Sequence, residues 1–90
     1  MGLNARGGAR RYVVDFSGPI LANLPETPTA ALSASAGNVS EPAVQRNPAT
    51  RGIRVDFLLK PEDAELIELR LELKNGDRTI SDVWLARWTK

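Results

Sequence analysis

The sequence predicts an all-β fold, a two-layer antiparallel β-sandwich of six to seven short strands. Two segments, residues 53–59 and 67–73, carry apolar side chains at every second position, mostly with charged residues between them. This alternation sends the apolar side chains to one face of a sheet and the charged ones to the other. Turn-forming glycine, proline and asparagine residues separate the apolar segments at spacings of about 8–12 residues, which is typical of a sandwich.

The first strand is predicted at residues 11–16, with its aromatic and β-branched residues on one face: Tyr12, Val14 and Phe16. The proline-rich segment that follows, up to residue 29, cannot form a long regular element because proline lacks the backbone donor that a ladder needs. Three apolar residues of this segment are expected to reach the core: Ile20, Leu21 and Leu24.

The middle of the chain predicts three more strands. Residues 30–36 form a strand of small residues with Leu32 as its main apolar anchor. Residues 39–47 follow, and Pro42 within them predicts an edge position or a bulge. After a turn at residues 47–52, residues 53–60 give the clearest strand, which Pro61 ends.

Residues 61–74 permit two interpretations. Pro61 with the acidic residues after it resembles a helix N-terminus, and Leu66, Leu69 and Leu73 have helical spacing. The fourfold alternation from Ile67 to Leu73 favours a strand, because a helix would scatter those residues around its circumference. The strand then turns at Asn75-Gly76-Asp77, and residues 79–88 return as its partner.

Composition excludes several classes of function. The 90 residues correspond to one domain, and 12 basic against 11 acidic residues leave a net charge of +1, which argues against a dedicated nucleic-acid binder. The chain contains neither cysteine nor histidine, so disulfides, thiolate sites and histidine general bases are excluded. No apolar run approaches the roughly 18 residues of a membrane-spanning helix. Residues 1–9, rich in glycine and arginine, are predicted to be a flexible leader or linker remnant without the apolar core of a signal peptide.

The acidic residues give no catalytic signature. Most alternate with apolar residues or cluster at turns, where a solvated charge is the usual state. Glu68 and Glu72 flank Arg70, a pattern that favours ion pairs on an outer face. We therefore expect no catalytic carboxylate pair, no metal site and no cofactor.

Trp84 and Trp88 are the candidate contact residues. On a strand both point to one face together with Ala86, while Val83 and Leu85 point to the other. Two interpretations stay open. In the first, one face joins the core and the other packs on a neighbouring domain, and in the second the indole rings form a platform for sugar stacking. Arg87 is a polar residue at the rim of either surface.

Several motifs, in their order and spacing, resemble the C-terminal end of the periplasmic glucan biosynthesis protein G/D family (MdoG, also called OpgG, and OpgD). They are Arg10-Arg11-Tyr12-Val13-Val14-Asp15-Phe16, Val44-Gln45-Arg46-Asn47-Pro48, Ile67-Glu68-Leu69-Arg70, Asn75-Gly76-Asp77-Arg78 and the closing pair Trp84 and Trp88. One turn departs from the family pattern, because relatives usually have Gly-Gly-Trp where this chain has Arg51-Gly52-Ile53.

The resemblance implies that residues 10–90 form the immunoglobulin-like C-terminal domain of a longer protein. Members of the family are exported to the periplasm of Gram-negative bacteria, with the signal peptide far upstream, and take part in making osmoregulated periplasmic glucans, which are branched β-linked glucose oligomers. Glycoside-hydrolase activity is associated in some members with a large N-terminal β-sandwich. No catalytic residue carries over to this chain, and the resemblance settles residues 66–74 as strand.

The resulting expectation is a non-catalytic module that packs against the glucan-acting N-terminal domain, without a membrane span or nucleic-acid partner. The expected domain or glucan contacts are Arg70, Trp84, Arg87 and Trp88. The alternative is an independent carbohydrate-binding module that contacts β-glucan through Trp84 and Trp88.

Overall fold

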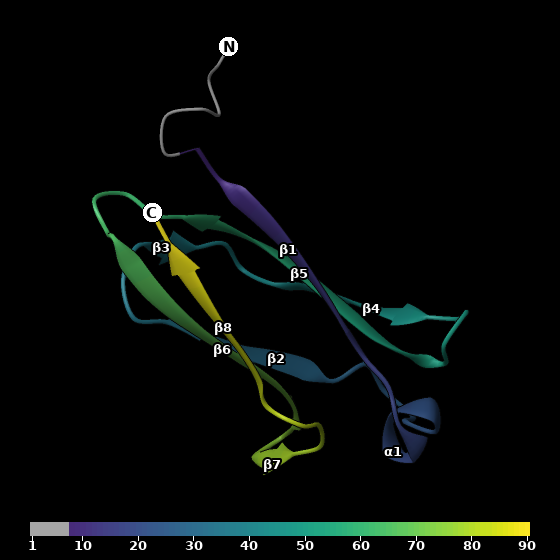
Figure 1. Ribbon diagram of the computed structural model, residues 1–90. Coiled ribbons are helices and arrows are strands. Elements are labelled where there is room, and N and C mark those ends of the chain that lie inside the picture. The colour runs from purple at the N-terminus through teal and green to yellow at the C-terminus, as the bar shows by residue number, and fades with distance from the viewer. Residues whose placement is uncertain (1–7) are drawn as a thin grey trace.

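The computed structural model describes residues 8–90 and contains two four-stranded antiparallel sheets with one short helix (Figure 1). The first sheet consists of β1 (Arg10–Phe16), β5 (Gly52–Lys60), β3 (Asn38–Val39) and β4 (Ala43–Asn47). The second sheet consists of β2 (Thr29–Ala34), β6 (Leu66–Asn75), β7 (Arg78–Thr79) and β8 (Trp84–Thr89). Helix α1 (Pro19–Ala22) lies in the connection from β1 to β2. The predicted all-β sandwich is confirmed.

The strand order is that of an immunoglobulin-like sandwich. In the first sheet β5 is central, with β1 on one side and β3 and β4 on the other. In the second sheet β6 is central, between β2 and the pair β7 and β8. These orders correspond to strands B-E-D and C-F-G of the immunoglobulin fold. Within residues 8–90, no strand takes the place that strand A has beside B in that fold.

The core lies between the sheets and is built mainly from the two alternating segments. Because successive strand residues point to opposite faces, β5 and β6 each present one apolar row to the other sheet. The apolar residues of this core are all at most 8% exposed: Val14, Phe16, Leu21, Ile53, Val55, Phe57, Leu59, Ile67, Leu69, Leu71 and Leu73. The predicted inward faces of these strands are therefore confirmed.

The segment with two interpretations is a strand. The whole of β6 is paired, to β2 along one edge and to β7 and β8 along the other. This arrangement buries the four alternating apolar residues completely or almost so, which a helix could not do. The helical signal at Pro61 is reduced to one turn, in which the Ala64 N–H donates to the Pro61 carbonyl at 3.0 Å.

Two strands that the sequence predicts as continuous are divided. Residues 39–47 contain β3 and β4, and the register against β5 shifts by one residue between them, so the Pro42 region forms the predicted bulge. Residues 79–88 contain β7 and β8. Between them the Leu73 N–H donates to Ser81 Oγ at 2.9 Å. Because this acceptor is a side chain and not a backbone carbonyl, the backbone hydrogen-bond ladder is interrupted there.

The connection from β1 to β2 agrees only in part with the expectation. Leu21 is 3% exposed and Leu24 packs against the core, as predicted. Ile20 is 56% exposed, so the prediction that it is anchored in the core is wrong. In the short helix α1, neighbouring residues point in different directions, and only the Leu21 side chain is directed inward. The predicted flexible leader falls on residues 1–7, outside the described residues, and on residues 8–9 before β1.

Candidate functional site

Strand β8 places its two tryptophans on the inner side of the sandwich. Trp84 lies opposite Leu71 and Trp88 opposite Ile67, and directly opposed residues of antiparallel strands project from the same face. Leu71 and Ile67 are fully buried, so the indole rings face the core, where both are partly buried. Leu85 and Arg87 consequently point away from the core.

Trp84 joins the two sheets through an aromatic cluster. The rings of Tyr12 on β1 and Phe57 on β5 are stacked, with centroids 5.2 Å apart and an interplanar angle of 10°. The Trp84 indole meets both rings edge-on, with centroid distances of 5.8 Å to Tyr12 and 6.2 Å to Phe57. Edge-to-face contacts of this kind stabilise beyond the area that they bury. Trp84 is therefore part of the packing between the sheets.

A shallow hollow of about 280 Å³ lies beside this cluster, where β1 and the start of β8 approach each other. We call it the β1–β8 hollow. Its lining combines apolar and polar side chains: Val14, Asp15, Phe16, Ser17, Ser81, Asp82, Val83 and Trp84. The sandwich is thus open beside Trp84, which accounts for its partial exposure although it faces the core.

The opposite surface of the second sheet carries the two arginines. Arg70 lies opposite Leu85, and Arg87 lies opposite Glu68, with Arg87 Nη2 3.2 Å from Glu68 Oε2. This surface, which we call the outer β6–β8 face, also holds two of the six large apolar side chains that are exposed among the described residues: Leu66 (46%) and Leu85 (70%). The structure therefore brings Arg70 and Arg87 together but separates them from Trp84 and Trp88. The contact role of all four residues stays a prediction.

Glu72 departs from the expectation that the acidic residues are solvated. It is 6% exposed, although it lies on the side of β6 that faces away from the core. Its carboxylate lies 3.2 Å from Arg70 Nη2 and 3.8 Å from Lys74 Nζ. The predicted ion pairing around Arg70 is thus confirmed for Glu72, whereas Glu68 pairs across the strands with Arg87.

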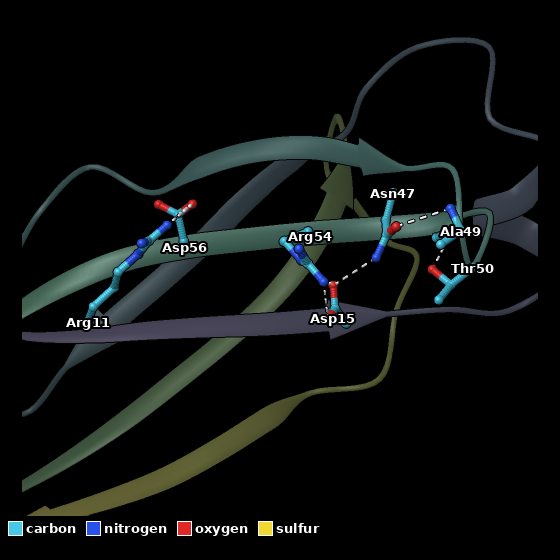
Figure 2. A network of polar contacts seen from close by, with 8 residues as sticks. Arg11, Asp15, Asn47, Ala49, Thr50, Arg54 and Asp56 are labelled. Carbon is cyan, nitrogen blue, oxygen red and sulfur yellow. Dashed lines mark hydrogen bonds and ion pairs between the residues drawn. The ribbon is translucent and has the colours of Figure 1, made fainter.

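The first sheet carries an ion-pair network on its outer face that sequence reasoning missed (Figure 2). Arg54 donates to both carboxylate oxygens of Asp15, at 2.9 and 3.1 Å, and Asn47 Nδ2 donates to the same carboxylate at 3.4 Å. Farther along the same strands, Arg11 lies 3.4 Å from Asp56. The partners are 39 and 45 residues apart in sequence, so only the pairing of β1 with β5 brings them together.

The Arg54 guanidinium lowers the pKa of Asp15 below its ordinary value of 3.8, and the Asn47 amide adds to this effect while desolvation opposes it. The same ion pair raises the pKa of Arg54. Because the carboxylate binds its proton less readily in the folded state, its stabilising contribution is fully present above pH 3.8 and is lost as the pH falls through the lowered pKa.

We therefore expect the free energy of unfolding to decrease on acidification below about pH 4, and Asp15→Asn to make that decrease less steep. Urea unfolding between pH 2.5 and pH 7 measures both slopes. The matched control is Asp77→Asn, which removes a turn carboxylate that makes no ion pair among the described residues. Equal slopes for wild type and Asp15→Asn would contradict the assignment.

The described part of the chain holds no group of three or more acidic side chains that could bind a metal ion. Every side-chain nitrogen and oxygen atom buried within it has a hydrogen-bond partner. Its one helix has four residues, so no helix there has the length and apolar character needed to cross a membrane.

Fold and surface together define a small immunoglobulin-like β module with an ion-paired face on one sheet and a partly apolar, exposed face on the other. The model of the family described as "Periplasmic glucan biosynthesis protein, MdoG" matches residues 2–88. The chain belongs to this family.

Relatives named Glucans biosynthesis protein G are similar to most of the chain. The protein from Shewanella frigidimarina is 46% identical over 81 residues, which are 89% of this chain and 14% of the relative. The protein from Shewanella baltica is 45% identical over 82 residues, 89% of this chain and 15% of the relative. The one from Rhodopseudomonas palustris is 38% identical over 89 residues, 98% of this chain and 18% of the relative. The chain thus spans less than a fifth of the length of these relatives.

Proposed function

We propose that the chain acts as a non-catalytic immunoglobulin-like module of a periplasmic protein that takes part in the biosynthesis of osmoregulated, β-linked glucans. Its role is to pack against and steady the N-terminal domain that acts on the glucan. Membership of the MdoG family and the similarity to a small share of much longer relatives support this proposal. The periplasm is the corresponding location.

The outer β6–β8 face is the observation that carries the packing role. Leu66 and Leu85 leave exposed apolar area on either side of the Glu68–Arg87 ion pair. Exposed apolar area framed by polar groups is typical of interaction sites. Arginines suit such a site because the side chain can bury its apolar methylene stem while its guanidinium group still forms hydrogen bonds or ion pairs.

Ion pairing supports a non-catalytic role. Four carboxylates each contact an arginine or a lysine: Asp15, Asp56, Glu68 and Glu72. A glycoside hydrolase needs two facing carboxyl groups in different protonation states, with the sugar between them. The ion-paired arrangement serves stability better than proton transfer.

The second candidate function is that of a carbohydrate-binding module. The β1–β8 hollow favours it, because the partly exposed Trp84 ring lies there beside the polar side chains of Ser81 and Asp82. Aromatic rings that offer an apolar face next to hydrogen-bonding groups suit a sugar.

Titration of the isotope-labelled chain, followed by NMR, separates the two functions. One titrant is a mixture of β-linked gluco-oligosaccharides, and the other is the separately produced remainder of a full-length Glucans biosynthesis protein G. We expect no saturable shifts with the sugars, and shifts centred on the amides of Leu66, Leu85 and Arg87 with the protein. Leu85→Asp is expected to weaken the protein complex by about tenfold or more, because it places a charge in an apolar contact.

Ile20→Asp is the matched control, since Ile20 is also a large exposed apolar residue but belongs to helix α1. It should leave the complex unchanged. Saturable shifts and a change in tryptophan fluorescence with the oligosaccharides would transfer the assignment to carbohydrate binding. Glucan turnover by the 90-residue chain would refute the non-catalytic role.

A further inference from the structure

Among residues 8–90, strand β1 is an edge strand of the first sheet. It pairs with β5 along its whole length, from Arg10 to Phe16, and no second strand among residues 8–90 pairs with it. An edge of this length presents a row of unpaired backbone donors and acceptors to any chain that can add a strand. The charges that the edge carries on its outer face, Arg11 and Asp15, have opposite signs.

The directions of the backbone N–H and C=O groups of β1 can be deduced from the pairing between β5 and β3. The Ser40 N–H donates to the Leu58 carbonyl at 2.9 Å, and the Leu58 N–H donates to Ser40 Oγ at 2.9 Å, so the backbone of Leu58 points toward β3. Successive residues alternate, and the backbone of Phe57 therefore points toward β1, where it meets Tyr12.

The same alternation on β1 directs the N–H and C=O groups of Tyr12 and Val14 to β5. Those of Arg11, Val13 and Asp15 point to the open edge. The side chain of Val13, between the two charges, is itself 49% exposed.

These three residues are self-complementary. When two copies of β1 pair antiparallel about Val13, Val13 lies opposite Val13 of the second copy, and Arg11 lies opposite its Asp15. A two-fold axis at Val13 produces this charged pair twice. Centring the pairing on Tyr12 or Val14 instead places one of the charges opposite Val13, without an ionic partner.

The network of Figure 2 extends this pattern across the dimer. Arg11 already lies beside Asp56, and Asp15 beside Arg54. Across the joined sheets each row would therefore run Asp56, Arg11, Asp15 of the second copy and Arg54 of the second copy, with alternating signs throughout. Cross-strand pairs of opposite charge stabilise a sheet, and like charges at these positions destabilise it.

The inner face supports the same arrangement. Tyr12 and Val14 of the second copy would continue the apolar face of the first sheet beyond β1. They would lie next to the β1–β8 hollow, where Trp84 remains partly open. Addition of the strand thus covers apolar area as well as backbone groups.

We propose that β1 is a homodimerisation edge: two copies of this chain join their first sheets antiparallel about Val13 and form one continuous eight-stranded sheet. This proposal goes beyond the packing role of the outer β6–β8 face and uses a different sheet.

Sedimentation velocity of the 90-residue chain between about 10 µM and about 1 mM, the range expected for a small interface, tests the proposal. We expect a reversible monomer–dimer equilibrium. Val13→Pro removes the N–H at the two-fold axis while leaving the bonds from β1 to β5 in place, because proline is tolerated where the N–H faces outward from an edge strand. We expect it to weaken dimerisation by about tenfold or more, since two hydrogen bonds are lost.

Val13→Thr is the matched control, because it keeps the backbone N–H and the β-branched shape, and it should dimerise like the wild type.

A second measurement does not depend on how Val13→Pro folds. The chain has no cysteine, so Val13→Cys introduces a single thiol at the axis, where paired Cα atoms lie about 5.5 Å apart, within the range for a disulfide. Leu85→Cys introduces one on the outer β6–β8 face.

Mild oxidation should cross-link Val13→Cys at least about tenfold faster than Leu85→Cys, because pre-association raises the local thiol concentration. A chain that stays monomeric at every concentration and cross-links equally at both positions overturns the proposal. A dimer that persists in Val13→Pro and is lost in Leu85→Asp also overturns it, and assigns self-association to the outer β6–β8 face.

Discussion

Replacing Gly52 by alanine is expected to destabilise the sandwich by about 3 kcal/mol or more, at or above the upper end of typical overpacking costs. Gly52 begins β5 and is buried where β1 ends. A Cβ atom there would overlap the carbonyl oxygen of Phe16 and lie 3.1 Å from its carbonyl carbon. These are backbone atoms, so relief requires the ends of β1 and β5 to separate, next to the buried side chains of Phe16 and Ile53.

Urea denaturation followed by tryptophan fluorescence measures this change. Gly76→Ala is the control: Gly76 has a φ of 66°, and an added Cβ meets nothing within 4 Å. It should cost only about 1–2 kcal/mol, the price of the left-handed conformation. If Gly52→Ala is no more destabilising than Gly76→Ala, the close approach of β1 and β5 does not exist as described.

The second large effect is expected for Trp84→Ala, which should lower the free energy of unfolding by about 3 kcal/mol. This value is at the lower end of the range for truncating a large aromatic residue, because the indole is partly exposed. The substitution removes both edge-on contacts, to Tyr12 and to Phe57, and leaves a gap between the sheets. In a domain of 90 residues, whose total stability is about 5–15 kcal/mol, this is a large fraction.

Thermal melting and urea titration of Trp84→Ala give the measurement, and Leu85→Ala is the control on the same strand. Leu85 is 70% exposed, so its truncation should change stability by no more than about 0.5 kcal/mol. An unchanged melting point for Trp84→Ala would show that the indole contributes little to packing, and would strengthen its interpretation as a contact residue for a domain or a glucan.

The two tryptophans show that a strand pattern predicts which residues share a face, but not which of the two faces packs on the core. The spacing of Trp84 and Trp88 correctly predicts that they share one face of a strand, since the period of two follows from backbone geometry alone. Which face is the core depends on the register between β8 and β6, and both faces of β8 carry apolar residues. Arg70 and Arg87 gather on the other face for the same reason.

Glu72 and Ile20 illustrate the limits of reading burial from residue type. Glu72 looks like any charged residue between leucines, yet it is buried and lies within ion-pair distance of Arg70 and Lys74. Ile20 looks like a core residue, yet the short helix α1 directs it outward. In both cases the outcome depends on neighbours in space and on local direction, which hydrophobicity does not encode.

The amino-acid sequence by itself determined the class of fold, the inward faces of β5 and β6 and the turn at Gly76. Each of these follows from local periodicity or from the conformational range of a single residue. Only the tertiary structure decided the Asp15–Arg54 pair, the inward orientation of the indoles and the edge position of β1 among residues 8–90. These features arise where segments far apart in the chain are placed in register, and register is a property of the assembled sheets.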